Sequence, residues 1–137
     1  MIHHIDLPVV DIARSRAFYD RALSPLGLTL VIEKTNPYGH TVLGYGMLPD
    51  PVFWIRNGRP AIERLHIAFL AQTRRAVDEF HSAALAAGGV CNGPPGLRPR
   101  YDADYYAAFV IDVDGNNIEA VCRRAESEGP PHERGVE

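Results

Sequence analysis

One acidic side chain lies where the sequence otherwise predicts burial. Glu119 stands between Ile118 and Ala120 in the short apolar segment 117–122, which follows the turn 114–116. A buried carboxylate is unfavourable unless it is paired, hydrogen-bonded or bound to a metal ion. Glu119 is therefore expected to have a partner elsewhere in the chain.

Two of the six histidines, His4 and His66, occupy equivalent positions in an internal repeat. Adding 62 to a residue number in the first half carries His4 onto His66 and Asp11 onto Thr73. The same offset carries Phe18 onto Phe80, Ala22-Leu23 onto Ala84-Leu85 and Gly27 onto Gly89. These matches in one register indicate a tandem duplication.

Side chains alternate across a strand, and this alternation places the two histidines and Glu119 on corresponding faces. His4 shares its face with Asp6, and the bulky apolar residues of all three strands take the opposite face. Two imidazoles and a carboxylate that converge on a cavity can bind a divalent metal ion and leave coordination positions open. Zinc, iron, nickel and manganese all suit this donor set. The alternative, in which each histidine is an ordinary hydrogen-bonded residue, leaves Glu119 without a partner.

The elements that must position these residues form two β-α-β-β-β units. In the first unit, strands are predicted over 2–10, 27–33, 40–46 and 52–56, with a helix that begins after Asp11. In the second unit, strands are predicted over 64–70, 89–92, 107–113 and 117–122, with a helix that begins after Thr73 and a long loop over 93–104. The predicted fold class is α+β, with two tandem modules that form a curved mixed sheet around a metal-binding cup and carry their helices on the outer side.

These modules, about 1–58 and about 64–122, are expected to form one domain over 1–122, followed by a polar tail over 123–137. The net charge of −3 gives no reason to expect nucleic acid or an anionic membrane as a partner. No apolar run approaches the roughly 20 residues of a membrane span. No secretory signal is evident, so the expected location is the cytoplasm and the expected partner is a small molecule.

Three stretches resemble the vicinal-oxygen-chelate superfamily, which includes glyoxalase I, extradiol dioxygenases, fosfomycin-modifying enzymes and bleomycin-binding proteins. They are HIDLPVVDIARSRAFYDRALSPLGL, HIAFLAQTRRAVDEFHSAALAAGG and YYAAFVIDVDGNNIEAVC. The resemblance implies a metal ion in the cup, substrates bound through adjacent oxygens, and a homodimer that can build each site from two chains. It also places His4, His66 and Glu119 on the ligand positions.

The resemblance leaves the reaction open. The segment Val52–Arg56 has no carboxylate where glyoxalase I enzymes have a fourth ligand, and Phe109 stands where dioxygenases and fosfomycin transferases usually have a tyrosine. We expect a glyoxalase-like lyase or isomerase that acts on a small oxygen-rich substrate. An extradiol-type dioxygenase, a thiol transferase, and a drug-binding resistance protein without catalysis are the alternatives.

Other side chains could act beside the metal ion. Asp6 is a candidate base or a hydrogen-bond partner of a ligand, and its alternative is a rim carboxylate in a salt bridge. Tyr105 is a candidate hydroxyl donor to the substrate. The remaining predicted pocket residues are Phe53, Trp54, Arg56 and Phe109. The loop 93–104 is either a lid or a connector.

Overall fold

The structure is a computed structural model that describes residues 1–59 and 63–125. The first half contains β1 (Ile5–Val9), α1 (Ile12–Leu23), a 3-10 turn (Ser24–Leu26), β2 (Thr29–Thr35), β3 (Thr41–Met47) and β4 (Asp50–Asn57). The second half contains β5 (His66–Leu70), α2 (Arg74–Ala86), β6 (Val90–Leu97), β7 (Tyr106–Ile111) and β8 (Asn117–Cys122). This order confirms the predicted α+β class and the two β-α-β-β-β modules.

Both helices begin at the predicted residues because a side-chain oxygen accepts a hydrogen bond from the first turn. Asp11 Oδ1 accepts from the backbone N–H of Arg14 at 3.1 Å, and Thr73 Oγ1 accepts from that of Ala76 at 3.0 Å. After α1 the chain turns at Gly27, whose φ of +80° is a conformation that glycine adopts without strain. The repeat is therefore also visible in the local structure.

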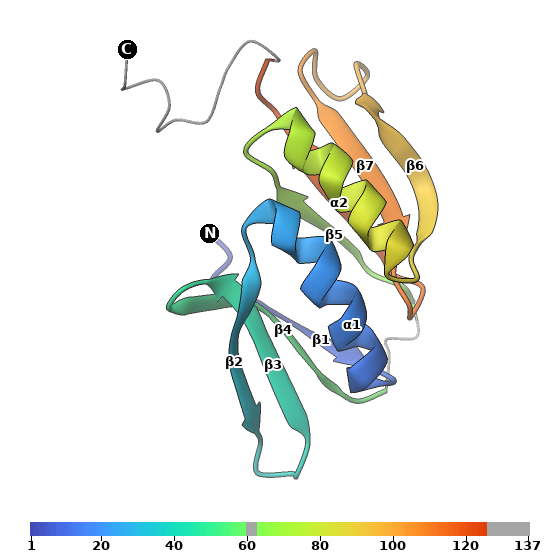
Figure 1. The fold of residues 1–137 in the computed structure, drawn as a ribbon. Coiled ribbons are helices and arrows are strands. Elements are labelled where there is room, and N and C mark those ends of the chain that lie inside the picture. The colour runs from blue at the N-terminus through green and yellow to red at the C-terminus, as the bar shows by residue number, and fades with distance from the viewer. Residues whose placement is uncertain (60–62, 126–137) are drawn as a thin grey trace.

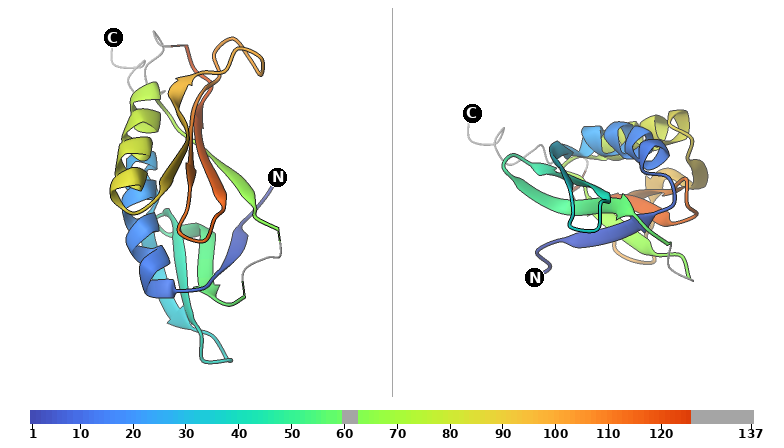
Figure 2. Two further views of the ribbon diagram at one scale, coloured as in Figure 1. Left: turned by 90° about the vertical axis from the view of Figure 1, so that its right-hand side faces the viewer. Right: turned by 90° about the horizontal axis from the view of Figure 1, so that it is seen from below.

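The strands form two four-stranded sheets, with the orders β1-β4-β3-β2 and β5-β8-β7-β6. In each sheet the first strand of the module pairs in parallel with the last, and the other pairs are antiparallel. The predicted curved sheet is thus divided into one sheet per module. Both helices cover the same side of the molecule, and the opposite faces of the two sheets are left open (Figures 1 and 2).

One hydrophobic core joins the two modules. Phe18 and Tyr19 of α1 and Phe80 of α2 are fully buried in it. Across the module boundary, the rings of Phe53 and Phe69 meet edge to face at a centroid distance of 5.3 Å. The placement of one sheet relative to the other is therefore fixed by buried contacts on the helix side.

The prediction of a loop from residue 93 was wrong, because β6 continues to Leu97 through Pro94 and Pro95. A proline cannot donate a backbone hydrogen bond, but β6 is an edge strand that pairs only with β7, and its register shifts twice. The true connection is the short turn after Leu97, where the N–H of Arg98 bonds to the carbonyl of Tyr105 at 2.7 Å.

Neither helix in the described ranges has the length and apolar character needed to cross a bilayer. Most of the predicted polar tail, residues 126–137, lies outside the described residues.

Candidate metal and substrate site

Two of the three predicted metal ligands meet on the open face of the second sheet. Glu119 of β8 is only 1% exposed, and its Oε1 lies 2.8 Å from His66 Nε2 at the start of β5. Its Oε2 accepts a hydrogen bond from the Tyr105 hydroxyl at 2.5 Å. The buried carboxylate therefore has the partner that its position in the sequence requires, and a second partner besides.

The separation of His66 and Glu119 suits two ligands of one ion. Two donors that each lie about 2.1 Å from an ion, in adjacent positions of an octahedron, are about 3.0 Å apart. The observed distance of 2.8 Å between the nitrogen and the oxygen is close to this value. The spacing is compatible with a shared ion, and it is equally the length of a direct hydrogen bond between the imidazole and the carboxylate.

Tyr105 is held as a hydrogen-bond donor. Partial burial and the hydrogen bond to the Glu119 carboxylate raise the pKa of its hydroxyl to about 12. The phenol therefore stays protonated at neutral pH, so it can donate a proton in a hydrogen bond but cannot serve as a ready base. Phe109 lies beside this group, with its ring centroid 6.2 Å from that of His66.

His4 does not join this pair within one chain. It is exposed, and its Nδ1 lies 2.8 Å from Nδ1 of His3. Among residues 1–59 and 63–125, no group of three or more histidine, cysteine, aspartate or glutamate side chains could hold a metal ion together. One chain therefore brings together two of the predicted ligands, and the third lies just before β1 of the other sheet.

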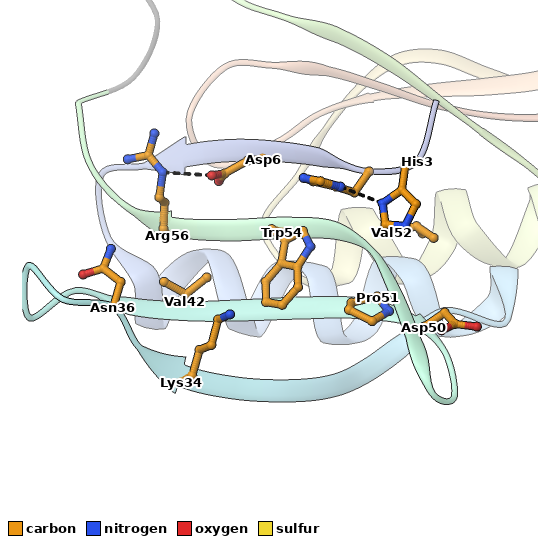
Figure 3. A pocket seen from close by; sticks show the side chains of 11 residues that line it. His3, Asp6, Lys34, Asn36, Val42, Asp50, Pro51, Val52, Trp54 and Arg56 are labelled. Carbon is orange, nitrogen blue, oxygen red and sulfur yellow. Dashed lines mark hydrogen bonds and ion pairs between the residues drawn. The ribbon is translucent and has the colours of Figure 1, made fainter. Parts of the chain in front are cut away.

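His4 instead lines a cavity of about 830 Å³ on the open face of the first sheet. The cavity walls come from β1, β2, β3 and β4, and Trp54 stands between Asp6 on one side and Pro51 on the other (Figure 3). A volume of this size is within the range of pockets that hold small organic ligands. The first module thus supplies a substrate-sized space, and the second supplies the buried carboxylate.

Asp6 faces this cavity, as the alternation of the strand predicts, and it is already paired. Arg56 Nε lies 3.2 Å from Asp6 Oδ2, and both side chains are partly exposed (Figure 3). This contact matches the alternative of a rim carboxylate in a salt bridge. The role of Asp6 as a base stays a prediction, and Arg56 is engaged by a carboxylate of its own chain.

Phe53 and Trp54, both proposed as pocket walls, lie on opposite faces of β4. Trp54 lines the open cavity, whereas Phe53 is 1% exposed and packs on Tyr19 and Phe69 in the core. Phe53 therefore packs in the core and also borders a second cavity of about 350 Å³, whereas the wall of the open cavity is Trp54.

The sequence interpretation missed Lys34, whose ammonium lies 4.9 Å from the centroid of the Trp54 ring. Its position two residues after Ile32, and so on the same face of the strand, was the available signal. Near the second sheet, a smaller cavity of about 260 Å³ is lined by Arg98, Tyr101 and Phe109. The Arg98 guanidinium donates to the carbonyls of Pro94 and Gly96 and is thereby held against the end of β6.

Two sheets with paired β-α-β-β-β modules, covered by helices on one side and bearing a His–Glu pair on the other, define a class of two-module α+β folds. Residues 1–120 match the model of the glyoxalase/bleomycin resistance protein/dioxygenase superfamily. The chain belongs to this family. The comparison with curated proteins gave no match.

Solved structures show the same fold. A glyoxalase/bleomycin resistance protein from Albidiferax ferrireducens is 34% identical, with a TM-score of 0.71 over 88% of this chain and 97% of the other. Glyoxalase I from Zea mays is 22% identical, with a TM-score of 0.67 over 88% of this chain and 45% of the other, so this chain spans about half of that protein.

A further neighbour was solved with bound ligands. The fosfomycin resistance protein FosX from Listeria monocytogenes, as an E126Q mutant with Mn(II) and 1S,2S-dihydroxypropylphosphonic acid, is 20% identical to this chain. Its TM-score is 0.64 over 98% of this chain and 96% of the other. At this identity the likeness shows the fold alone.

Proposed function

We propose that this protein is a divalent-metal-dependent, glyoxalase-like enzyme of the lyase or isomerase type that acts on a small oxygen-rich substrate. The observation that carries the proposal is Glu119, a carboxylate 1% exposed that lies 2.8 Å from His66 on an open sheet face. Such a group is costly to bury, and a cation shared with the imidazole offsets that cost.

Each side chain of this site would have a different role in the reaction. His66, Glu119 and His4 would hold the ion, which when bound polarises a substrate carbonyl or lowers the pKa of a bound water. Tyr105, whose raised pKa keeps it protonated, would donate a hydrogen bond to a substrate oxygen or keep the Glu119 carboxylate in place. Asp6, once released from Arg56, is the candidate base.

Metal analysis tests the ion. Purified protein incubated separately with zinc, manganese, nickel and ferrous ions, then desalted, is expected to retain about one ion per chain of at least one metal. His66→Ala and Glu119→Ala should abolish this retention. His40→Ala, which changes an exposed histidine on the β2–β3 turn, is the matched control and should retain the ion. Equal retention by His40→Ala and His66→Ala, or none by the native protein, would refute the proposal.

The third ligand would come from a second copy of the chain. In one chain, His4 contacts His3 and directly precedes β1, which belongs to a different sheet from Glu119. Apolar side chains are also exposed along the edges that a second copy could cover, among them Met47, Leu48 and Leu70, which are 58%, 79% and 64% exposed. A homodimer would bury these side chains and place His4 of the partner subunit beside the His66–Glu119 pair.

Mixed dimers test this arrangement. Coexpressed His4→Ala and His66→Ala chains form mixed dimers in which one site has a full ligand set and the other has lost two ligands. With random pairing, the mixture is expected to retain about a quarter of the native metal. If His4 and His66 serve the same site within one chain, every site in the mixture lacks a ligand, and retention should not exceed that of the separate variants.

A binding protein without catalysis is the second candidate. The cavity beside Trp54 favours it, because this cavity forms in one chain and none of its walls comes from the second sheet. Tight binding of a small molecule by protein that retains no metal would favour this candidate over the enzyme. An extradiol-type dioxygenase or a thiol transferase would share the metal ligands, and product analysis distinguishes them.

A further inference from the structure

The open face of the first sheet carries an aromatic surface that the fold keeps accessible. The Trp54 indole is partly exposed and crosses β3 at Gly44 (Figure 3). A Cβ atom at Gly44 would lie 2.9 Å from Trp54 Cζ3 and 2.7 Å from Ile32 Cγ2, closer than real side chains approach one another. The glycine therefore lets the indole rest on the sheet and present a flat surface to the cavity.

An unpaired cation lies beside this surface. Lys34, the only lysine of the chain, has its ammonium 4.9 Å from the indole centroid. Within the described ranges, no carboxylate lies within ion-pair distance of this ammonium, whereas Arg56 pairs with Asp6 and Arg16 pairs with Glu33. The attraction between a cation and an aromatic ring holds the ammonium near the indole and leaves its charge uncompensated.

The other charges of the cavity do not cancel this one. Asp6 is compensated by Arg56 at 3.2 Å. Asp50 lies at the far end of the cavity beyond Pro51, next to the turn between β3 and β4 (Figure 3). Lys34 therefore supplies the charge that lies against the indole, and a ligand that reaches the ring also reaches the ammonium.

We propose that this cavity binds a planar anion, namely an aromatic or conjugated carboxylate whose flat part lies against Trp54 and whose carboxylate pairs with Lys34. The inference rests on the proposed function in one respect only, that this ligand is the substrate of the metal site. Recognition by Trp54 and Lys34 requires no metal ion and uses side chains of one chain. The two proposals can therefore fail separately.

The chain offers its own reporter for a test, because Trp54 is its only tryptophan. Benzoate is the probe, benzamide is its neutral counterpart of the same shape, and cyclohexanecarboxylate is an anion without a flat ring. Titration is expected to give a saturable change in tryptophan fluorescence with benzoate. Benzamide and cyclohexanecarboxylate should each bind about tenfold more weakly, which corresponds to the loss of one good contact.

Variants then assign the two contacts. Lys34→Met keeps a side chain of similar length without its charge, and it should weaken benzoate about tenfold while leaving benzamide unchanged. Arg75→Met removes an exposed cation from α2 on the helix side and is the matched control, expected to bind like the native protein. Trp54→Leu, followed by ligand-observed NMR because it lacks the fluorophore, should lose benzoate binding.

The same titration on metal-free His66→Ala protein separates the proposals. Native benzoate binding by this variant supports the cavity proposal whether or not the native protein holds a metal ion. The proposal is overturned if Lys34→Met binds benzoate as the native protein does, if benzamide binds as well as benzoate, or if no saturable signal appears. Circular dichroism of each variant shows that a lost signal does not come from lost structure.

Discussion

Replacing Tyr19 by phenylalanine removes one oxygen atom from the contact that ties the first module to the second. Tyr19 lies on α1 and is fully buried, and its hydroxyl donates to Asp112 Oδ2 at 2.5 Å in the turn between β7 and β8. Asp112 is 5% exposed, so water cannot replace the lost donor. This turn leads directly into β8, the strand that carries Glu119.

The expected loss of stability in Tyr19→Phe depends on how many hydrogen-bond donors to Asp112 remain. Asp112 also accepts from the backbone N–H of Asp114 and from the backbone and side chain of Asn116, at 2.9, 2.8 and 3.0 Å. A buried charge with no partner left costs about 3–5 kcal/mol, whereas one hydrogen bond to a charged group contributes about 1.5–3 kcal/mol. Because three donors remain, the smaller range applies to Tyr19→Phe. The corresponding fall in the melting temperature is about 6–12 °C for a chain of this length.

Tyr45→Phe is the matched control. Tyr45 is also a buried phenol, but its hydroxyl donates at 2.8 Å to Asp20, whose side chain is 42% exposed and can be solvated by water. Its loss should cost only about 0.5–1 kcal/mol. Urea unfolding at pH 7, followed by circular dichroism and by Trp54 fluorescence, measures both variants. Equal costs for the two variants, or a cost for Tyr19→Phe below about 0.5 kcal/mol, would refute the reasoning.

Three further predictions concern the same fold. Burial raises the pKa of the Tyr19 and Tyr45 hydroxyls well above the usual value of 10.0, so both phenols stay protonated in the folded chain while those of the unfolded chain ionise. Stability should therefore be unaffected by these groups below pH 10 and should fall as the pH rises above it, and a melting temperature equal at pH 9 and pH 11 would contradict this. Gly89→Ala would place a Cβ 2.4 Å from a valine methyl carbon of β7, and we expect urea unfolding to show a loss of about 1–3 kcal/mol. Cys91 is exposed and Cys122 is buried, so a thiol reagent should modify one cysteine per chain in native protein and both in urea; two rapidly modified thiols in native protein would be the contrary result.

The local structure could be predicted from the sequence because its causes are local. Asp11 and Thr73 each accept the expected hydrogen bond at the start of a helix. The alternation of the strands correctly placed His66 and Glu119 on one face, since β5 and β8 are neighbours in one sheet. The demand of a buried carboxylate for a partner therefore led to the right histidine.

The parts that could not be predicted depend on contacts between distant elements. Alternation says that His4 and Asp6 share a face, but the position of the first sheet relative to the second is set by the packing of α1 and α2 and by Phe53 against Phe69. The extension of β6 through two prolines depends on its being an edge strand, which is a property of the sheet and not of the segment. The place of Lys34 in the site could not be predicted either, because it depends on the Trp54 indole of another strand lying beside the ammonium.

The two parts of the proposed site lie on different modules, so mutations can test them separately. The His66–Glu119 pair belongs to the second sheet, and the cavity of Trp54 and Lys34 belongs to the first. Changes at His66 should therefore alter metal retention without altering the binding of a planar anion, and changes at Lys34 should do the reverse. His4 is the one predicted ligand that lies in the cavity of the first sheet, so it is the residue at which both functions can meet. If the partner subunit's His4 completes the metal site, dilution of the dimer to monomers should release the ion and leave benzoate binding intact, because only the first property requires two chains.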